Sequence, residues 1–190
     1  MRAALAIAFL WFTAPAVAQD LSARLPTCLA CHGQEGTSAI PTVPSLGAMP
    51  VNYVLTQLYL FREKVRVADP MNAMAAGLTD DDLRALGDIF NKMPTPAPAP
   101  ALSAAEQEKA SALVSQYHCN SCHGADLGGQ QTIPRIAGQH AEYVRQALVG
   151  YKTNTRHGYS PAMNEAAQDV KDEEIPLLAR YVASFRAPTD

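Results

Sequence analysis

Apolar side chains recur at helical spacing along much of the chain, which predicts amphipathic helices over residues 53–62 and 142–151. A capping box formed by Ser103 and Glu106 predicts that another helix begins there and runs toward Tyr117. The segments around the cysteines show none of the alternation that is typical of strands. The pattern therefore predicts an all-α protein.

Two acidic segments predict two further helices near the ends of the pattern. Thr79 and the aspartates after it supply an N-cap and negative charge at a helix N-terminus, so we expect a helix from there through Phe90. Residues 172–185 are expected to form a matching helix, in which Pro176 is tolerable only in the first turn. Near the N-terminus, Pro26 weakens the helical pattern, so we expect the opening helix to be short.

The first residues, 1–18, have the pattern of a secretory signal peptide. Arg2 supplies a positive charge, residues 3–12 are almost wholly apolar, and residues 16–18 form a small-x-small cleavage site. The apolar run is shorter than the roughly 20 residues that a bilayer-spanning helix needs. An uncleaved membrane anchor is the alternative. We expect a soluble, exported mature chain that starts near Gln19.

A proline-rich segment divides the mature chain into two parts of similar length. Such a segment forms neither helix nor sheet ladder and behaves as a semi-rigid extended spacer. The predicted organisation is a first domain at residues 19–93, a linker at 94–102 and a second domain at 103–190. We call the two parts the first half and the second half.

Each half contains one copy of the motif Cys-x-x-Cys-His. The two copies hold all cysteines of the chain: Cys28 and Cys31 before His32, and Cys119 and Cys122 before His123. This spacing is the signature of covalent c-type haem attachment. Two thiols on one turn of chain each form a thioether to a vinyl group of one porphyrin, and the next residue lies under the iron as its proximal ligand. The sequence therefore predicts two covalently bound haem c groups.

Other uses of paired cysteines fit the sequence less well. A thioredoxin-like redox motif needs a βαβ context, which neither copy has. A four-cysteine zinc site usually has about 15–20 residues between its pairs, whereas Cys31 and Cys119 lie in different halves of the chain. Disulfides form in oxidising compartments, but they would not explain a histidine after both copies.

The two halves align with each other, and the alignment selects a second axial ligand in each. A Met-Asn dipeptide occurs at corresponding places, at Met71 and at Met163, just before the acidic segments. Methionine opposite histidine suits electron transfer, whereas an open position would suit small-ligand chemistry. We therefore expect Met71 and Met163 to ligate the irons, with Met74 as the alternative in the first half. Three histidines of the second half are weaker candidates, expected at the surface or in supporting roles: His118, His140 and His157.

Further aligned pairs are candidates to support the haems. Pro44 and Pro134 follow the motif histidines at similar distances, so their backbone carbonyls could accept the second ring N–H of each histidine. Arg66 and Arg156 also align, and their guanidinium groups could neutralise haem propionates by bidentate hydrogen bonds. A solvated charge is the alternative for each arginine.

These residues together resemble the dihaem class I cytochromes c of the cytochrome c4 type, over almost the whole mature chain. The resemblance is carried by two Cys-x-x-Cys-His-Gly motifs, the Pro-x-x-x-Gly-Gln-His segment at residues 134–140, and the methionines that precede acidic helices. It implies two tandem class I cytochrome c domains, each around one covalent haem, in a periplasmic electron carrier. Residues 48–50 depart from the pattern at the place of residues 138–140, which implies unequal haem surroundings.

The expected function is transfer of single electrons between respiratory redox partners, a reductase and an oxidase, without catalysis. The alternative is the dihaem subunit of a dehydrogenase complex, similar to a flavocytochrome, that takes electrons from a catalytic partner. A dihaem enzyme such as a peroxidase or a thiosulfate oxidase would want an open sixth position, and the two methionines argue against it. The formal charge of −3 at pH 7 argues against nucleic acid as a partner. Peripheral association with membrane complexes is compatible with the sequence, and no oligomeric state is predicted.

Overall fold

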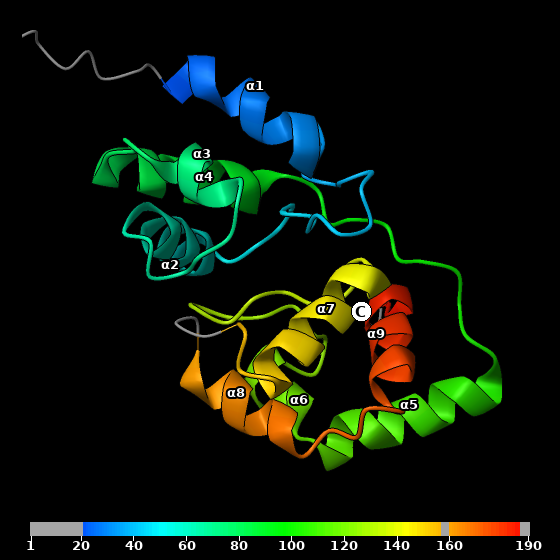
Figure 1. The fold of residues 1–190 in the computed structure, drawn as a ribbon. Coiled ribbons are helices and arrows are strands. Elements are labelled where there is room, and N and C mark those ends of the chain that lie inside the picture. The colour runs from blue at the N-terminus through cyan, green and yellow to red at the C-terminus, as the bar shows by residue number, and fades with distance from the viewer. Residues whose placement is uncertain (1–20, 157–159, 187–190) are drawn as a thin grey trace, which may run out of the picture.

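The computed structural model describes residues 21–156 and 160–186, and regular structure in them is helical apart from an isolated β-bridge between Gln130 and Ile133. Figure 1 shows two groups of helices joined by an extended segment. The first group contains α1 (Leu21–His32), α2 (Val51–Arg62), α3 (Met71–Ala75) and α4 (Asp80–Lys92). The second group contains α5 (Ala104–Gln116), α6 (Cys119–His123), α7 (Ala141–Lys152), α8 (Pro161–Gln168) and α9 (Ile175–Ser184). The all-α prediction is confirmed.

The structure contains both of the N-terminal helix caps that the sequence predicts, at Thr79 and at Ser103. The Thr79 hydroxyl accepts the Asp82 N–H at 3.1 Å, and the Asp82 carboxylate accepts the Thr79 N–H at 2.8 Å, which closes a capping box at the start of α4. Ser103 and Glu106 form the same reciprocal pair at the start of α5. Each box satisfies N–H groups that have no partner within their helix.

The prediction for the last helix was wrong at its start, because α9 begins at Ile175 rather than near Asp172. Pro176 lies in the first turn of α9. Its ring would clash with the carbonyl of the residue four positions earlier in a longer helix, and it has no N–H to donate. The helix of the second half therefore starts later than α4, although the acidic residues align.

The halves also differ in the helical structure that leads into the Cys-x-x-Cys-His motif. In the first half, α1 is one continuous helix of 12 residues that contains both Pro26 and the motif. In the second half, α5 ends before the motif and His118 takes the left-handed conformation, at φ +53°, between α5 and α6. We expected a short opening helix in the first half, but α1 continues through Pro26 as far as His32.

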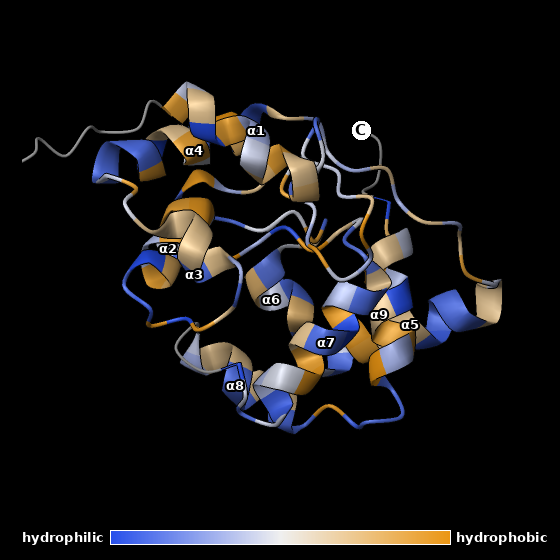
Figure 2. Ribbon diagram, turned by 45° about the horizontal axis from the view of Figure 1, so that its top comes forward, coloured by the Kyte–Doolittle hydropathy of each residue, from blue (hydrophilic) through white to orange (hydrophobic). Residues whose placement is uncertain are grey.

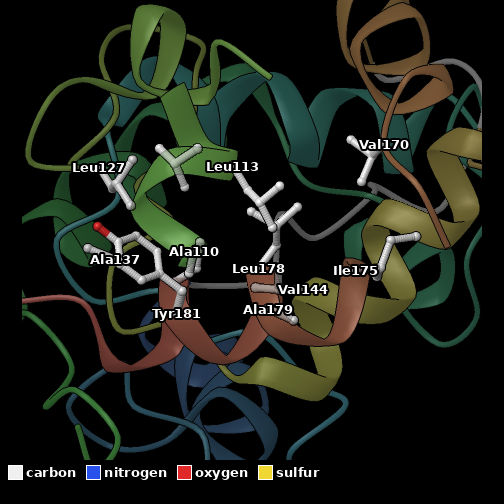
Figure 3. Packing of buried hydrophobic residues seen from close by; sticks show 12 residues of the cluster. Ala110, Leu113, Leu127, Ala137, Val144, Val170, Ile175, Leu178, Ala179 and Tyr181 are labelled. Carbon is white, nitrogen blue, oxygen red and sulfur yellow. The ribbon is translucent and has the colours of Figure 1, made fainter. Parts of the chain in front are cut away.

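Each half has its own hydrophobic core. In the first half, the core joins α1, α2 and α4 through Leu29, Val54, Phe61, Leu83, Leu86 and Phe90, among others. In the second half, Ala110 and Leu113 of α5 pack against Leu178 and Tyr181 of α9, as Figure 3 shows. Figure 2 shows both apolar and polar residues on α4 and α7, as expected for helices with one buried side.

The proline-rich segment runs along both halves instead of standing free. A side chain at Gly47 would lie 2.2 Å from the Pro94 carbonyl oxygen, and one at Gly138 would lie 2.9 Å from that of Pro96. The Ala99 N–H donates to the Ala183 carbonyl at 2.8 Å. The predicted signal peptide, residues 1–18, lies outside the described residues. Within the described part, no helix is long and apolar enough to span a bilayer.

Candidate functional site

A cavity of about 630 Å³ lies beside the motif of the first half. Cofactor pockets in proteins measure about 300–1,000 Å³. Cys28 and His32 line the cavity from α1, Met71 and Met74 from α3, and several apolar side chains complete the wall: Leu21, Leu46, Leu58, Leu78, Leu86 and Phe90. This wall suits the large apolar ring of a porphyrin, with sulfur and nitrogen donors available to attach it and to bind its iron.

The two motif histidines are held by the same kind of hydrogen bond. His32 Nδ1 lies 2.8 Å from the Pro44 carbonyl oxygen, and His123 Nδ1 lies 2.9 Å from that of Pro134. A carbonyl oxygen only accepts, so Nδ1 carries the proton and Nε2 keeps a lone pair for a metal. Burial lowers the pKa of both histidines, and the hydrogen bonds to the prolines partly oppose this. Burial therefore favours the neutral form of both rings, which is the form that ligates a metal.

The four cysteines form two similar pairs, and no disulfide joins them. Cys28 and Cys119 are half-buried, whereas Cys31 and Cys122 are exposed. Burial raises the pKa of the Cys28 and Cys119 thiols. Dithiol redox motifs of the thioredoxin type work through a thiolate whose pKa is lowered. The surroundings of these thiols therefore argue against that use and suit conversion to uncharged thioethers.

The candidate axial methionines lie on short helices that the sequence pattern did not predict. Met71 is half-buried on α3 and packs against the first core, whereas Met74, one turn later, is 38% exposed. Met163 is half-buried on α8. Met49 is buried within the first core, where it serves packing.

The asparagine after each methionine anchors its helix in the same way. Asn72 Nδ2 donates to the Phe61 carbonyl at 2.8 Å, and Asn164 Nδ2 donates to the Tyr151 carbonyl at 2.9 Å. Phe61 and Tyr151 lie in the last turns of α2 and α7 and align with each other in the repeat. The Met-Asn dipeptide therefore pairs each candidate sulfur ligand with a neighbour that fixes its place.

The two candidate propionate-binding arginines meet at the junction of the halves. Arg66 is buried and donates to Gln57 Oε1 at 2.6 Å, and Arg156 donates to the Tyr143 hydroxyl at 2.7 Å. Burial alone would raise the pKa of the Tyr143 phenol, but the charges of Arg156 and Arg66 outweigh it and lower the pKa. One phenol of the second half thus responds to an arginine from each half.

A second set of contacts across the junction involves residues that the sequence did not single out. Gln139 makes two hydrogen bonds to the backbone of Ser45, and Arg135 Nε donates to the Gly47 carbonyl at 3.1 Å. Arg135 is 3% exposed, and burial lowers its pKa to about 10. The mismatch between residues 48–50 and residues 138–140 marked the place of Gln139 in the sequence, but it did not mark Arg135.

Of the other histidines, the structure describes His118 and His140. His140 Nε2 donates to the Ser38 carbonyl of the first half at 2.8 Å. His118 is exposed and precedes α6. His157 lies outside the described residues.

Comparison with known proteins identifies the family. Residues 107–186 match the Cytochrome c family. Cytochrome c4 of Thiocapsa roseopersicina is 32% identical over 170 residues, which cover 82% of this chain and 85% of that protein. The chain belongs to the cytochrome c4 family. It is therefore a dihaem electron-transfer cytochrome rather than an enzyme, and its two Cys-x-x-Cys-His motifs fit the attachment sites of two covalent haem c groups.

Two further relatives extend the comparison. The solved structure of cytochrome c4 from Acidithiobacillus ferrooxidans has a TM-score of 0.75 and 27% identity, and the match covers 84% of this chain and 99% of that one. A protein of Thiomonas intermedia named thiosulfate dehydrogenase electron acceptor is 28% identical over 97% of this chain and 91% of its own length. The predicted arrangement of two class I cytochrome c domains is thus confirmed at the level of the fold, and redox proteins are its partners.

Proposed function

We propose that the protein is a periplasmic electron carrier in which His32 and Met71 ligate one haem iron and His123 and Met163 ligate the other. The observation that carries the proposal is the pair of hydrogen bonds from the histidine Nδ1 atoms to proline carbonyls, which leaves Nε2 free in both halves. Haem iron held by histidine and methionine supplies a one-electron ferrous–ferric couple at a raised potential.

Each group of residues has a defined part in this proposal. The cysteines of each motif, Cys28 with Cys31 and Cys119 with Cys122, hold the porphyrins by thioethers. Pro44 and Pro134 orient the histidines and set their tautomer. Arg66 and Arg156 neutralise haem propionates near the junction, where Arg66 donates to Gln57 and Arg156 donates to the Tyr143 hydroxyl.

The domain division at residues 19–93, 94–102 and 103–190 belongs to the same proposal. The two separate core clusters support it, since each half buries its own apolar residues. Cleavage of residues 1–18 during export would deliver the chain to the periplasm, where the haems are attached. The mass of the mature protein tests this part, because it must equal the chain from Gln19 onward plus two haems.

A redox titration followed by optical and magnetic spectra tests the ligand assignment. We expect two haems per chain, both low-spin with histidine and methionine ligands, and two one-electron steps. Replacement of Met71 or Met163 by alanine should alter one haem and leave the other unchanged. High-spin haem in the resting protein, or rapid turnover of peroxide, would contradict the assignment.

The second candidate is a dihaem acceptor that works with a dehydrogenase. The name of the Thiomonas intermedia relative favours it, since that protein is described as the electron acceptor of thiosulfate dehydrogenase. Purification of the native protein separates the two candidates. A free carrier is expected to purify alone, whereas a subunit would purify with a catalytic partner in fixed stoichiometry.

A further inference from the structure

One peptide group of the first half has a hydrogen-bond partner on each side. Its carbonyl, that of Pro44, accepts from His32 Nδ1 at 2.8 Å. Its N–H, that of Ser45, donates to Gln139 Oε1 of the second half at 2.9 Å. Gln139 Nε2 also donates to the Ser45 carbonyl at 3.0 Å, so one side chain holds both backbone groups of Ser45.

These contacts are buried. Ser45 is 1% exposed and Gln139 is 2% exposed, so water does not compete for either group. Arg135 Nε donates to the Gly47 carbonyl at 3.1 Å and ties the same loop to the second half two residues later. The peptide that accepts the hydrogen bond from His32 Nδ1 is therefore positioned by the second half.

Among the described residues, no side chain of the first half holds the Pro134–Arg135 peptide in the same way. Met49 stands at the place in the repeat that Gln139 occupies in the second half, and it is buried in the first core. A thioether has no N–H and accepts hydrogen bonds only weakly, so Met49 lacks the two-sided bonding that Gln139 provides. The second half thus positions the peptide that bonds to His32, whereas Met49 cannot do the same for His123.

We infer that Gln139 is a positioning residue for the haem of the first half, acting on the iron through the Pro44–Ser45 peptide and His32. A hydrogen bond to the N–H of a peptide polarises its carbonyl and makes that oxygen a stronger acceptor. A stronger acceptor raises the basicity of the ligating imidazole. A more basic imidazole favours ferric iron, so Gln139 lowers the potential of the first haem relative to the second.

The inference rests on the proposed ligation of the first iron by His32, and a Gln139→Met variant tests it. This substitution installs the residue that the first half carries at the same place. At a fixed applied potential, we expect the ratio of reduced to oxidised first haem to rise about two- to threefold, because a neighbouring hydrogen bond changes the next one only by a fraction. The second haem should keep its ratio.

Proton and nitrogen NMR of the reduced protein with labelled histidine gives an independent readout. The Nδ1–H signals of His32 and His123 report the two hydrogen bonds separately. In the unaltered protein the His32 proton should lie at lower field than the His123 proton, and in Gln139→Met it should move upfield. This comparison within the unaltered protein remains available if the variant fails to fold.

His140→Ala is the matched control, because it removes a hydrogen bond from the same loop to the Ser38 carbonyl without touching the Pro44–Ser45 peptide. It should leave the His32 signal in place. Equal shifts in both variants, or an unmoved His32 signal in Gln139→Met, would overturn the inference. A protein without low-spin haem would instead refute the proposed ligation, so the two failures are distinguishable.

Discussion

The two halves of the molecule agree where a haem is held and differ where the halves meet. In both, the motif histidine donates to a proline carbonyl, and an asparagine after the candidate methionine bonds to the last turn of the preceding long helix. Across the junction, however, Gln139 and Arg135 of the second half bond to the backbone of the first, and their counterparts there are Met49 and Ser45. The two halves thus share the support of the motif histidine, whereas the backbone contacts made by Gln139 and Arg135 run from the second half to the first.

The largest effect should come from removing one pair of thiols. With Cys119 and Cys122 both changed to serine, we expect a chain that holds one haem instead of two. The second half should lose most of its stability, because a domain of this size is marginal without its cofactor. The pyridine haemochrome assay measures the haem content per chain.

The matched variant changes Cys28 and Cys31 to serine. It should keep the haem of the second half, whose core and motif are separate from those of the first. If the removal of one pair of cysteines abolished both haems, the two halves would have to fold as one unit rather than as separate domains.

Replacing the candidate methionines tests whether the two halves also share the same axial ligands of the iron. Met71→Ala and Met163→Ala should each lower the potential of one haem, by a sizeable part of the roughly 0.8 V over which axial ligands shift haem potentials. Met74→Ala is the control, since this side chain lines the same cavity as Met71 but is more exposed. If Met74→Ala changed the haem spectrum and Met71→Ala did not, the iron ligand in the first half would be Met74, one turn later in α3.

How far the sequence predicts the structure differs between these regions for a physical reason. Local chemistry determines a capping box such as Ser103 with Glu106 and the motif spacing of Cys28 and Cys31, so both can be read from neighbouring residues. Pro176 accounts for the start of α9 at Ile175, although the acidic residues before it predicted an earlier start. The roles of Gln139 and Arg135 depend on how two domains dock, and no local pattern carries that information.

Core substitutions at aligned positions compare the stability of the two halves. Leu86 and Leu178 are 1% and 3% exposed and correspond in the repeat. Replacing either by alanine should cost about 2–5 kcal/mol of the free energy of unfolding, because it removes buried methyl groups and leaves a cavity. Denaturant unfolding followed at the haem bands measures it. Ile40→Ala, at a side chain that is 41% exposed, should cost about 0.5 kcal/mol or less.

The smallest expected effect concerns acid, and it belongs to the second half alone. Hydrogen bonds from Arg145 and Gln146 lower the pKa of Glu142 from 4.5 to about 2, whereas Asn52 stands at the corresponding place in α2. A carboxyl whose pKa is lowered by folding contributes stability above its unfolded pKa and loses it as the pH falls through the folded value. Glu142→Gln should therefore be less stable than the unaltered protein near pH 6, and the difference should shrink between pH 4.5 and about 2. Thermal unfolding across this range measures the difference.

Glu108→Gln, which removes the same charge from an exposed site on α5, should show a smaller dependence on pH. An equal dependence in both variants would mean that net charge, rather than the contacts of Glu142, sets the response to acid.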